Sequence, residues 1–96
     1  MKAAVFVDVE NIQVKTIPDP MCGPDDIVIK IYASGICGSD IRNYHAGLRG
    51  GVKNQVIGHE AAGEVVEVGA NVERYRIGDR VAVAPDVSCG ECYYCK

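Results

Sequence analysis

The sequence lacks any long apolar run and any surplus of positive charge. The first apolar stretch covers only residues 3–7 before Asp8 interrupts it, which is shorter than the roughly 7–15 apolar residues of a secretory signal. No stretch approaches the ~20 apolar residues that a membrane-spanning helix needs. The formal net charge of −3 leaves no electrostatic footprint for nucleic acid or anionic lipid. We therefore expect a cytoplasmic protein with no nucleic-acid or membrane partner.

The sequence also lacks an internal repeat, a low-complexity tract, an interior domain boundary and a G-x-G-x-x-G string of the dinucleotide-binding kind. Its 96 residues, 48% of them hydrophobic and 24% charged, are ordinary for one modest globular domain. Cysteine, in contrast, is well represented, with five copies. A small disulfide-stapled protein normally has an even number, and cytosolic cysteines are more often metal ligands or catalytic groups.

The hydrophobic pattern is mostly that of short strands. Runs rich in β-branched residues, separated by Pro- and Gly-containing turns, predict strands over residues 2–7, 11–17, 26–33, 61–68 and 80–84. In the third run, period-two alternation places Ile27, Ile29 and Ile31 on one face. Only residues 39–45 lack alternation, and they predict a short helix capped by Ser39 or Asp40. We therefore expect a mainly β fold, a small and partly open barrel with one short helix.

Three cysteines near the carboxyl end form the pattern C-x2-C-x2-C: Cys89, Cys92 and Cys95. Two-residue spacers let a tight loop direct successive thiolates at one ion, and a structural zinc is normally held by four ligands. Burying three thiols in a polar, Gly-containing loop would gain little, so packing explains the pattern poorly. The spacing predicts a metal site whose fourth ligand we expect beyond Lys96. An iron–sulfur cluster is the alternative, because its cysteine run begins with the same spacing.

Cys37 and His59 form a second candidate site, and Glu60 adds a carboxylate beside the histidine. A thiolate, an imidazole and a carboxylate are suitable zinc ligands, and an open fourth position distinguishes a catalytic zinc from a structural one. These residue types alone leave a simpler alternative open. A lone cysteine is often a small core residue, and a histidine beside glycine is often only a hydrogen-bonded polar group.

Four motifs in order resemble the zinc-containing branch of the medium-chain dehydrogenase/reductase family: GICGSD at residues 35–40, GHEAAGEV at residues 58–65, GDRV at residues 78–81, and the cysteine cluster. The resemblance runs from Met1 to Lys96 and is strongest to sorbitol (polyol), threonine and sugar-alcohol dehydrogenases. It implies that residues 1–96 are an amino-terminal GroES-like domain of a longer enzyme, with the Rossmann domain later in the chain. These residues alone should then be inactive.

Position by position, the resemblance implies that Cys37 and His59 bind the catalytic zinc, with Glu60 as a ligand or a close partner that exchanges with water or substrate. Ser39 would carry the first step of a proton relay, and Asp40 would orient His59 through a hydrogen bond. The cysteine cluster would hold a structural zinc. The implied reaction is oxidation of a secondary alcohol to a ketone with NAD or NADP, zinc acting as Lewis acid, in a homo-oligomer (dimer or tetramer).

The sequence departs from this family at one relay position, where many relatives have histidine and this chain has Arg42. His45 is either a substitute or a solvent-exposed loop histidine. Tyr44 either lines a substrate pocket or simply packs. The polar residues 42–44 and the Gly-rich loop after them favour a polyol, sugar alcohol or amino alcohol over a long apolar substrate. Cys22 matches no motif and is expected to be an incidental thiol.

One alternative of a different class remains. Because the family's amino-terminal domain is similar in fold to the co-chaperonin barrel, the chain could be a non-catalytic zinc-binding module of GroES-like fold. Two observations separate the hypotheses. Dehydrogenase activity that depends on Cys37 indicates the enzyme, and a coloured protein indicates an iron–sulfur carrier.

Overall fold

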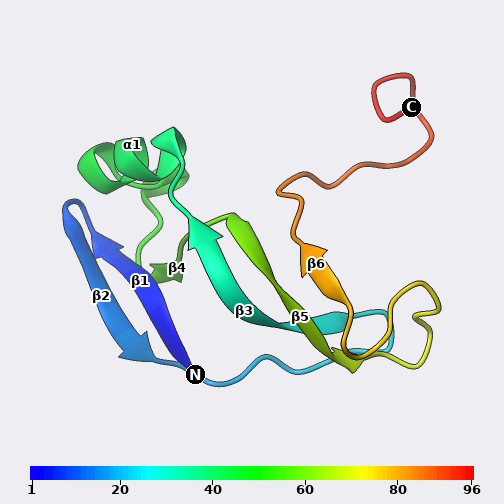
Figure 1. The fold of residues 1–96 in the computed structure, drawn as a ribbon. Helices are drawn as coiled ribbons and strands as arrows, with labels where there is room; N and C mark the ends of the chain where they lie inside the picture. The colour runs from blue at the N-terminus through cyan, green and yellow to red at the C-terminus, as the bar shows by residue number, and fades with distance from the viewer.

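The computed structural model describes residues 1–96 as two three-stranded antiparallel sheets and one short α-helix (Figure 1). The first sheet has the order β2-β1-β4, from β1 (Lys2–Asp8), β2 (Asn11–Thr16) and β4 (Gln55–Val56). The second has the order β3-β5-β6, from β3 (Ile27–Gly35), β5 (Glu60–Val68) and β6 (Arg80–Ala82). All five expected strands are present, with ends within two residues of those predicted. The expectation of a mainly β fold with a short helix is confirmed.

The first sheet is a hairpin to which β4 adds a short edge. β1 supplies the best-buried side chains of this sheet, Val5 at 5% and Phe6 at 1% exposure. The hairpin turns through Glu10, whose φ of 56° is left-handed, and the Glu10 N–H donates to the Tyr44 carbonyl over 2.7 Å. The tip of the hairpin is therefore fastened to the helix. The sequence did not predict β4, because two residues are too few to show a periodicity.

The second sheet is built on the long antiparallel pair of β3 and β5. The register runs from Ile27 opposite Val68 to Gly35 opposite Glu60, with two irregularities that leave Val66 and Tyr32 without partners. Such bulges bend a strand and increase its twist. This register brings the end of β3 to the start of β5, where two of the sequence motifs meet. The predicted alternation is only partly reflected in burial, since Ile31 remains 50% exposed.

The helix α1 (Gly38–Ala46) begins one residue earlier than expected, and its N-cap is Cys37. The predicted cap at Ser39 or Asp40 was therefore wrong in position. Asp40 still contributes from the third helical position, where its carboxylate accepts the Cys37 N–H over 2.9 Å, the reach-back half of a capping box. The helix ends before Gly47, and a short 3₁₀ turn, η1 (Arg49–Gly51), follows it. No helix reaches the length and apolar character that crossing a membrane requires.

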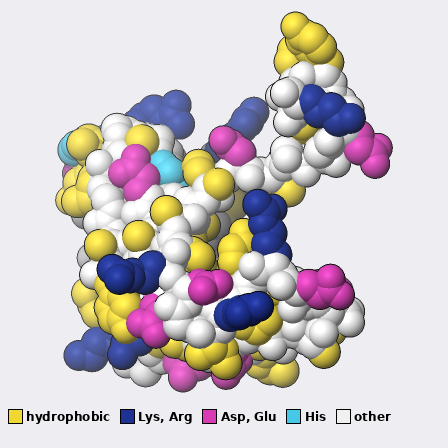
Figure 2. All heavy atoms as spheres, turned by 45° about the vertical axis from the view of Figure 1, so that its right-hand side comes forward, with side chains coloured by type: hydrophobic (Ala, Val, Ile, Leu, Met, Phe, Trp, Pro, Cys, Tyr) yellow, Lys and Arg dark blue, Asp and Glu magenta, His cyan; other side chains and the backbone are white.

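Very little of the molecule is buried. Only four residues fall in the buried class, and the exposed surface is 7644 Å², whereas a compact protein of this mass exposes about 5,400 Å². Residues after β6 leave the sheets without forming a helix or strand. Figure 1 shows this segment, orange to red, standing away from the sheets, and Figure 2 shows a hollow between it and the body. The sheets thus form an open barrel, as predicted.

Candidate metal centres

The first candidate centre lies where the end of β3 meets the start of β5. Cys37 follows β3 and caps α1, while His59 and Glu60 lie at the entry to β5. One ligand atom from each of these three residues falls within 4.8 Å of the other two. The chain separates Cys37 from His59 by 22 positions, and the antiparallel pairing of the two strands closes that gap. The structure thus brings together the three residues predicted as one set of ligands.

Hydrogen bonds across this cluster favour a thiolate and an imidazolium. The pKa of Cys37 lies below its ordinary value, because the Ser39 hydroxyl, the Ser39 N–H and the His59 ring all stabilise the thiolate. The pKa of His59 is raised mainly by its hydrogen bond with Cys37, with the negative charges of Asp40, Cys37 and Glu60 adding to the effect against the opposing effect of burial. The cluster therefore holds a concentrated negative potential at the imidazole, as a cation site requires.

Asp40 connects the helix start to the imidazole. One of its carboxylate oxygens is occupied by the Cys37 N–H, and the other, Oδ1, lies 3.6 Å from Nδ1 of His59. That separation is longer than a hydrogen bond, so the contact expected between these two residues takes the form of charge proximity here. The Asp40 side chain is 15% exposed and that of His59 34%, so the contact is partly shielded from solvent.

The donor set of this centre fits zinc. Zinc takes thiolate sulfur at about 2.3 Å and imidazole nitrogen or carboxylate oxygen at about 2.0–2.2 Å, so its ligand atoms lie roughly 3.3–3.8 Å apart. The three atoms here lie within 4.8 Å of one another, which is close to that spacing. A cavity of about 460 Å³ opens beside His59 and Glu60, bordered by Ala62, Ala82 and Pro85 among others. This cavity leaves room for a small ligand at the centre.

The second candidate centre is the cysteine loop at the carboxyl end. Cys95 Sγ lies 3.5 Å from Cys92 Sγ and 3.6 Å from Cys89 Sγ, close to the ~3.8 Å edge of a tetrahedron with zinc–sulfur bonds of about 2.3 Å. Backbone N–H groups of Glu91 and Cys92, followed by the two other thiols, lower the pKa of Cys89 to about 6. Gly90, with φ of 73°, supplies the left-handed turn that aims these N–H groups at one sulfur. The loop is arranged for a soft cation.

Several residues singled out in the sequence lie away from these centres. His45 is in the last turn of α1 and not in a loop, and its Nδ1 lies 3.0 Å from Glu10 Oε1 with both side chains about 60% exposed. These contacts favour the surface interpretation of His45. Arg42 is exposed on the same helix. Cys22 donates to the Asp26 carbonyl over 3.4 Å, and burial is the first cause of its raised pKa, which agrees with an incidental thiol outside both centres.

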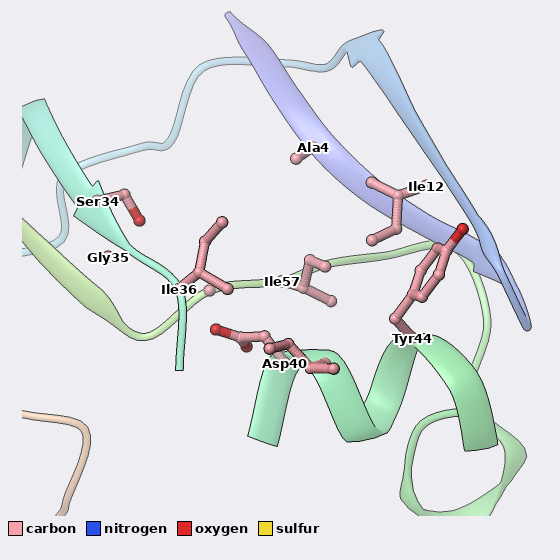
Figure 3. Close-up of a pocket in the computed structure, with 10 residues that line it drawn as sticks. Ala4, Ile12, Ser34, Gly35, Ile36, Asp40, Tyr44 and Ile57 are labelled. Atoms are coloured by element: carbon pink, nitrogen blue, oxygen red, sulfur yellow. The ribbon is translucent and has the colours of Figure 1, made fainter. Parts of the chain in front are cut away.

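Tyr44 lines a cavity of about 350 Å³ that does not include His59 or Glu60. Figure 3 shows its ring between α1 and the strand pair β1–β2, facing Ile12 and Ile57, with Asp40 at the opposite end of the same cavity. The walls are mainly aliphatic, and the ring is half-buried. The packing interpretation of Tyr44 is therefore the one that its surroundings favour.

One residue at the first centre was missed by the sequence analysis. Gly35 is the cross-strand partner of Glu60, and a side chain there would meet the glutamate directly. Its place in the GICGSD string was the only available signal. Its meaning depends on the strand register, which a single sequence does not reveal.

Fold and site together define a β domain with two candidate metal centres: two open sheets, a Cys–His–Glu cluster at the strand junction and a three-cysteine loop beyond it. A search of protein families matches residues 23–96 to the alcohol dehydrogenase GroES-like domain. The chain belongs to this family, and its fold is GroES-like.

Individual proteins agree with this assignment. Sorbitol dehydrogenase of Bacillus subtilis is 46% identical over 99 residues, covering 100% of this chain and 28% of that protein. The structure of the alcohol dehydrogenase TADH from Thermus sp. ATN1 matches 99% of this chain and 28% of its own, with a TM-score of 0.85 and 35% identity. The structure of an alcohol dehydrogenase of Escherichia coli CFT073, solved with NADH, matches 99% of this chain and 27% of its own, with a TM-score of 0.82 and 37% identity. The chain thus spans little more than a quarter of each.

Proposed function

We propose that these residues form the zinc-binding domain of a nicotinamide-dependent dehydrogenase that oxidises a secondary alcohol to a ketone. The observation that carries the proposal is the gathering of Cys37, His59 and Glu60 within 4.8 Å, beside a cavity large enough for a small substrate. Relatives that are alcohol and sorbitol dehydrogenases support it. Since the chain covers about a quarter of their length, the proposal concerns the longer protein that carries these residues.

In this proposal, Cys37 and His59 hold the catalytic zinc, and Glu60 is a third ligand or a close partner that yields its place to water or substrate. The thiolate character of Cys37, favoured by Ser39 and His59, suits it to the metal. When bound, zinc supplies a Lewis acid that lowers the pKa of a hydroxyl. Nicotinamide, NAD or NADP, supplies the hydride acceptor.

In this proposal, the chain's own residues transfer the proton of the substrate hydroxyl and hold the orientation of the His59 ring. Ser39, in the first turn of α1 beside Cys37, accepts the proton of the substrate hydroxyl and passes it toward solvent. Asp40 keeps the His59 ring in place through its negative charge, 3.6 Å away, and positions Cys37 by capping the helix. Glu60 is exposed, which allows its carboxylate to move aside when substrate enters.

Cys89, Cys92 and Cys95 are proposed to hold a second, structural zinc with a fourth ligand from later in the protein. Sulfur separations of 3.5 and 3.6 Å support this role. We propose a polyol, sugar alcohol or amino alcohol as substrate, because sorbitol and L-threonine 3-dehydrogenases are among the relatives. The whole protein is proposed to be a cytoplasmic homo-oligomer.

The proposal is tested on the full-length protein by metal analysis and by activity. We expect two zinc ions per chain, a colourless sample, and reduction of NAD or NADP with sorbitol, threonine or a simple secondary alcohol. Cys37→Ser should lose one zinc and the activity, while Cys22→Ser, which changes a thiol outside both centres, should lose neither. A zinc-loaded protein without activity on any of these substrates would support the non-catalytic module instead. Visible absorbance with bound iron would indicate a cluster.

A further inference from the structure

Gly35 and Glu60 face each other across the β3–β5 pair, at the point where the first metal centre is assembled. A Cβ atom added at Gly35 would overlap Oε2 of Glu60 and would lie 3.2 Å from the Glu60 Cβ and 3.4 Å from its Cδ. The three heavy atoms nearest that position, the immediate chain neighbours apart, all belong to Glu60. The space left by the missing side chain is therefore taken up by one carboxylate.

The backbone does not explain this glycine. Gly35 is not among the residues with positive φ, and it is the last residue of strand β3, so no left-handed backbone requires a glycine there. Glycine at a strand position without such a need weakens the strand and often marks a close approach. Here the group that approaches is Glu60, and Figure 3 shows Gly35 at the end of β3 as the chain turns toward the helix.

We propose that Gly35 is a positioning residue for the metal centre: its missing side chain provides the space in which the Glu60 carboxylate lies beside Cys37 and His59. This inference rests on the proposed metal site. Glu60 is exposed, so its carboxylate can rotate toward solvent when a methyl group is added at residue 35. The fold would persist while the third donor leaves the cluster. Gly35 thus acts through Glu60 and touches neither metal nor substrate.

The test is a Co²⁺ titration of the full-length protein, since zinc is spectroscopically silent. The absorbance that disappears in Cys37→Ser defines the part belonging to this centre and separates it from the cysteine loop. Gly35→Ala should bind Co²⁺ at this centre about tenfold more weakly, the size of effect typical when a group that supports a ligand is lost. The matched control is Gly38→Ala on the other side of Cys37, where an added Cβ meets nothing within 4 Å apart from its chain neighbours and the helix backbone; the Co²⁺ affinity of this variant should not change.

A double-mutant cycle with Glu60→Ala identifies the route of the effect. Once the glutamate is truncated, adding Gly35→Ala should change Co²⁺ affinity by no more than about twofold, because the group it displaces is gone. Thermal unfolding of each metal-free variant checks folding. If Gly35→Ala alone fails to fold, recovery of folding in the double variant supports the same collision, and failure of both variants counts against it.

Two results would overturn the inference. One is an unchanged affinity in Gly35→Ala. The other is an equal loss in both backgrounds, which would make Gly35 a determinant of the strand and not of Glu60. A wild-type protein without any Cys37-dependent cobalt absorbance would overturn the proposed metal site and this inference together.

Discussion

The Asp40 carboxylate accepts the backbone N–H of Cys37 over 2.9 Å and so fastens the proposed zinc thiolate to the first turn of α1. Its second oxygen lies 3.6 Å from the His59 ring. One side chain therefore positions one ligand through the backbone and polarises another through its charge. Substitutions at residue 40 can separate these two effects.

We expect Asp40→Asn to lower the pKa of His59 in the metal-free protein while α1 stays in place. The hydrogen bond with Cys37 is the main cause of the raised pKa, and the charge of Asp40 adds to it; removing that charge disfavours the imidazolium. An asparagine carbonyl can still accept the Cys37 N–H. An NMR titration of the His59 ring measures the change, and Asp40→Ala should in addition lose the hydrogen bond from the Cys37 N–H, worth about 1 kcal/mol. An unchanged pKa of His59 in Asp40→Asn would show that the Asp40 charge does not act on the imidazole.

If the full-length protein has the proposed dehydrogenase activity, we expect Ser39→Ala to lower its kcat by about 10²-fold or more, the usual contribution of a positioned proton-transfer group. His45→Ala should leave kcat unchanged, because its imidazole is bound to Glu10 on the exposed side of the helix. Steady-state kinetics with the preferred alcohol measures both. A large loss in His45→Ala together with a small loss in Ser39→Ala would reassign the relay to His45.

We expect Cys89 to be the most readily alkylated thiol of the metal-free protein at low pH. Thiolate is the nucleophile, so a thiol reacts once the pH rises through its pKa. For Cys89 that value is about 6, against about 8.5 for an ordinary cysteine, whereas the pKa of Cys22 is raised. Mass spectrometry after brief iodoacetamide treatment at pH 5–9 should give a Cys89 midpoint near pH 6 and little Cys22 product. Zinc should protect Cys89, and a midpoint above pH 8 would count against the arrangement of the loop.

We expect Phe6→Ala to cost about 3–5 kcal/mol of unfolding free energy, because it removes a buried aromatic ring from β1. Phe6 is 1% exposed, and few other buried side chains are available to replace its contacts. Chemical denaturation of the full-length protein measures the loss. The control is Val14→Ala on the neighbouring strand, 75% exposed, which should change stability by less than about 0.5 kcal/mol. Equal effects of the two substitutions would show that Phe6 does not serve as core.

The sequence predicted the elements better than their contacts. Runs rich in β-branched residues between turns indicated every strand except β4, because a strand leaves a local signature in its side chains. β4 left no such pattern, and the start of α1 was displaced because cysteine is an unusual N-cap. The proposed metal ligands were indicated by whole motifs and only weakly by their spacing. Their proximity depends on the register of β3 against β5, which no local pattern encodes, and Gly35 was missed for the same reason.

The segment after β6 is the only covalent connection from the sheets to the cysteine loop, and it determines how strongly metal binding at the two candidate centres is coupled. Its last backbone hydrogen bond to the sheets is from Val83 to Ala61, and beyond it the only backbone hydrogen bonds lie within the cysteine loop. Coupling between sites is carried by packed side chains and rigid elements, and this segment offers none. The free energy of filling one centre should therefore be independent of the other. Within these residues, the two zinc ions should load in either order, without cooperativity.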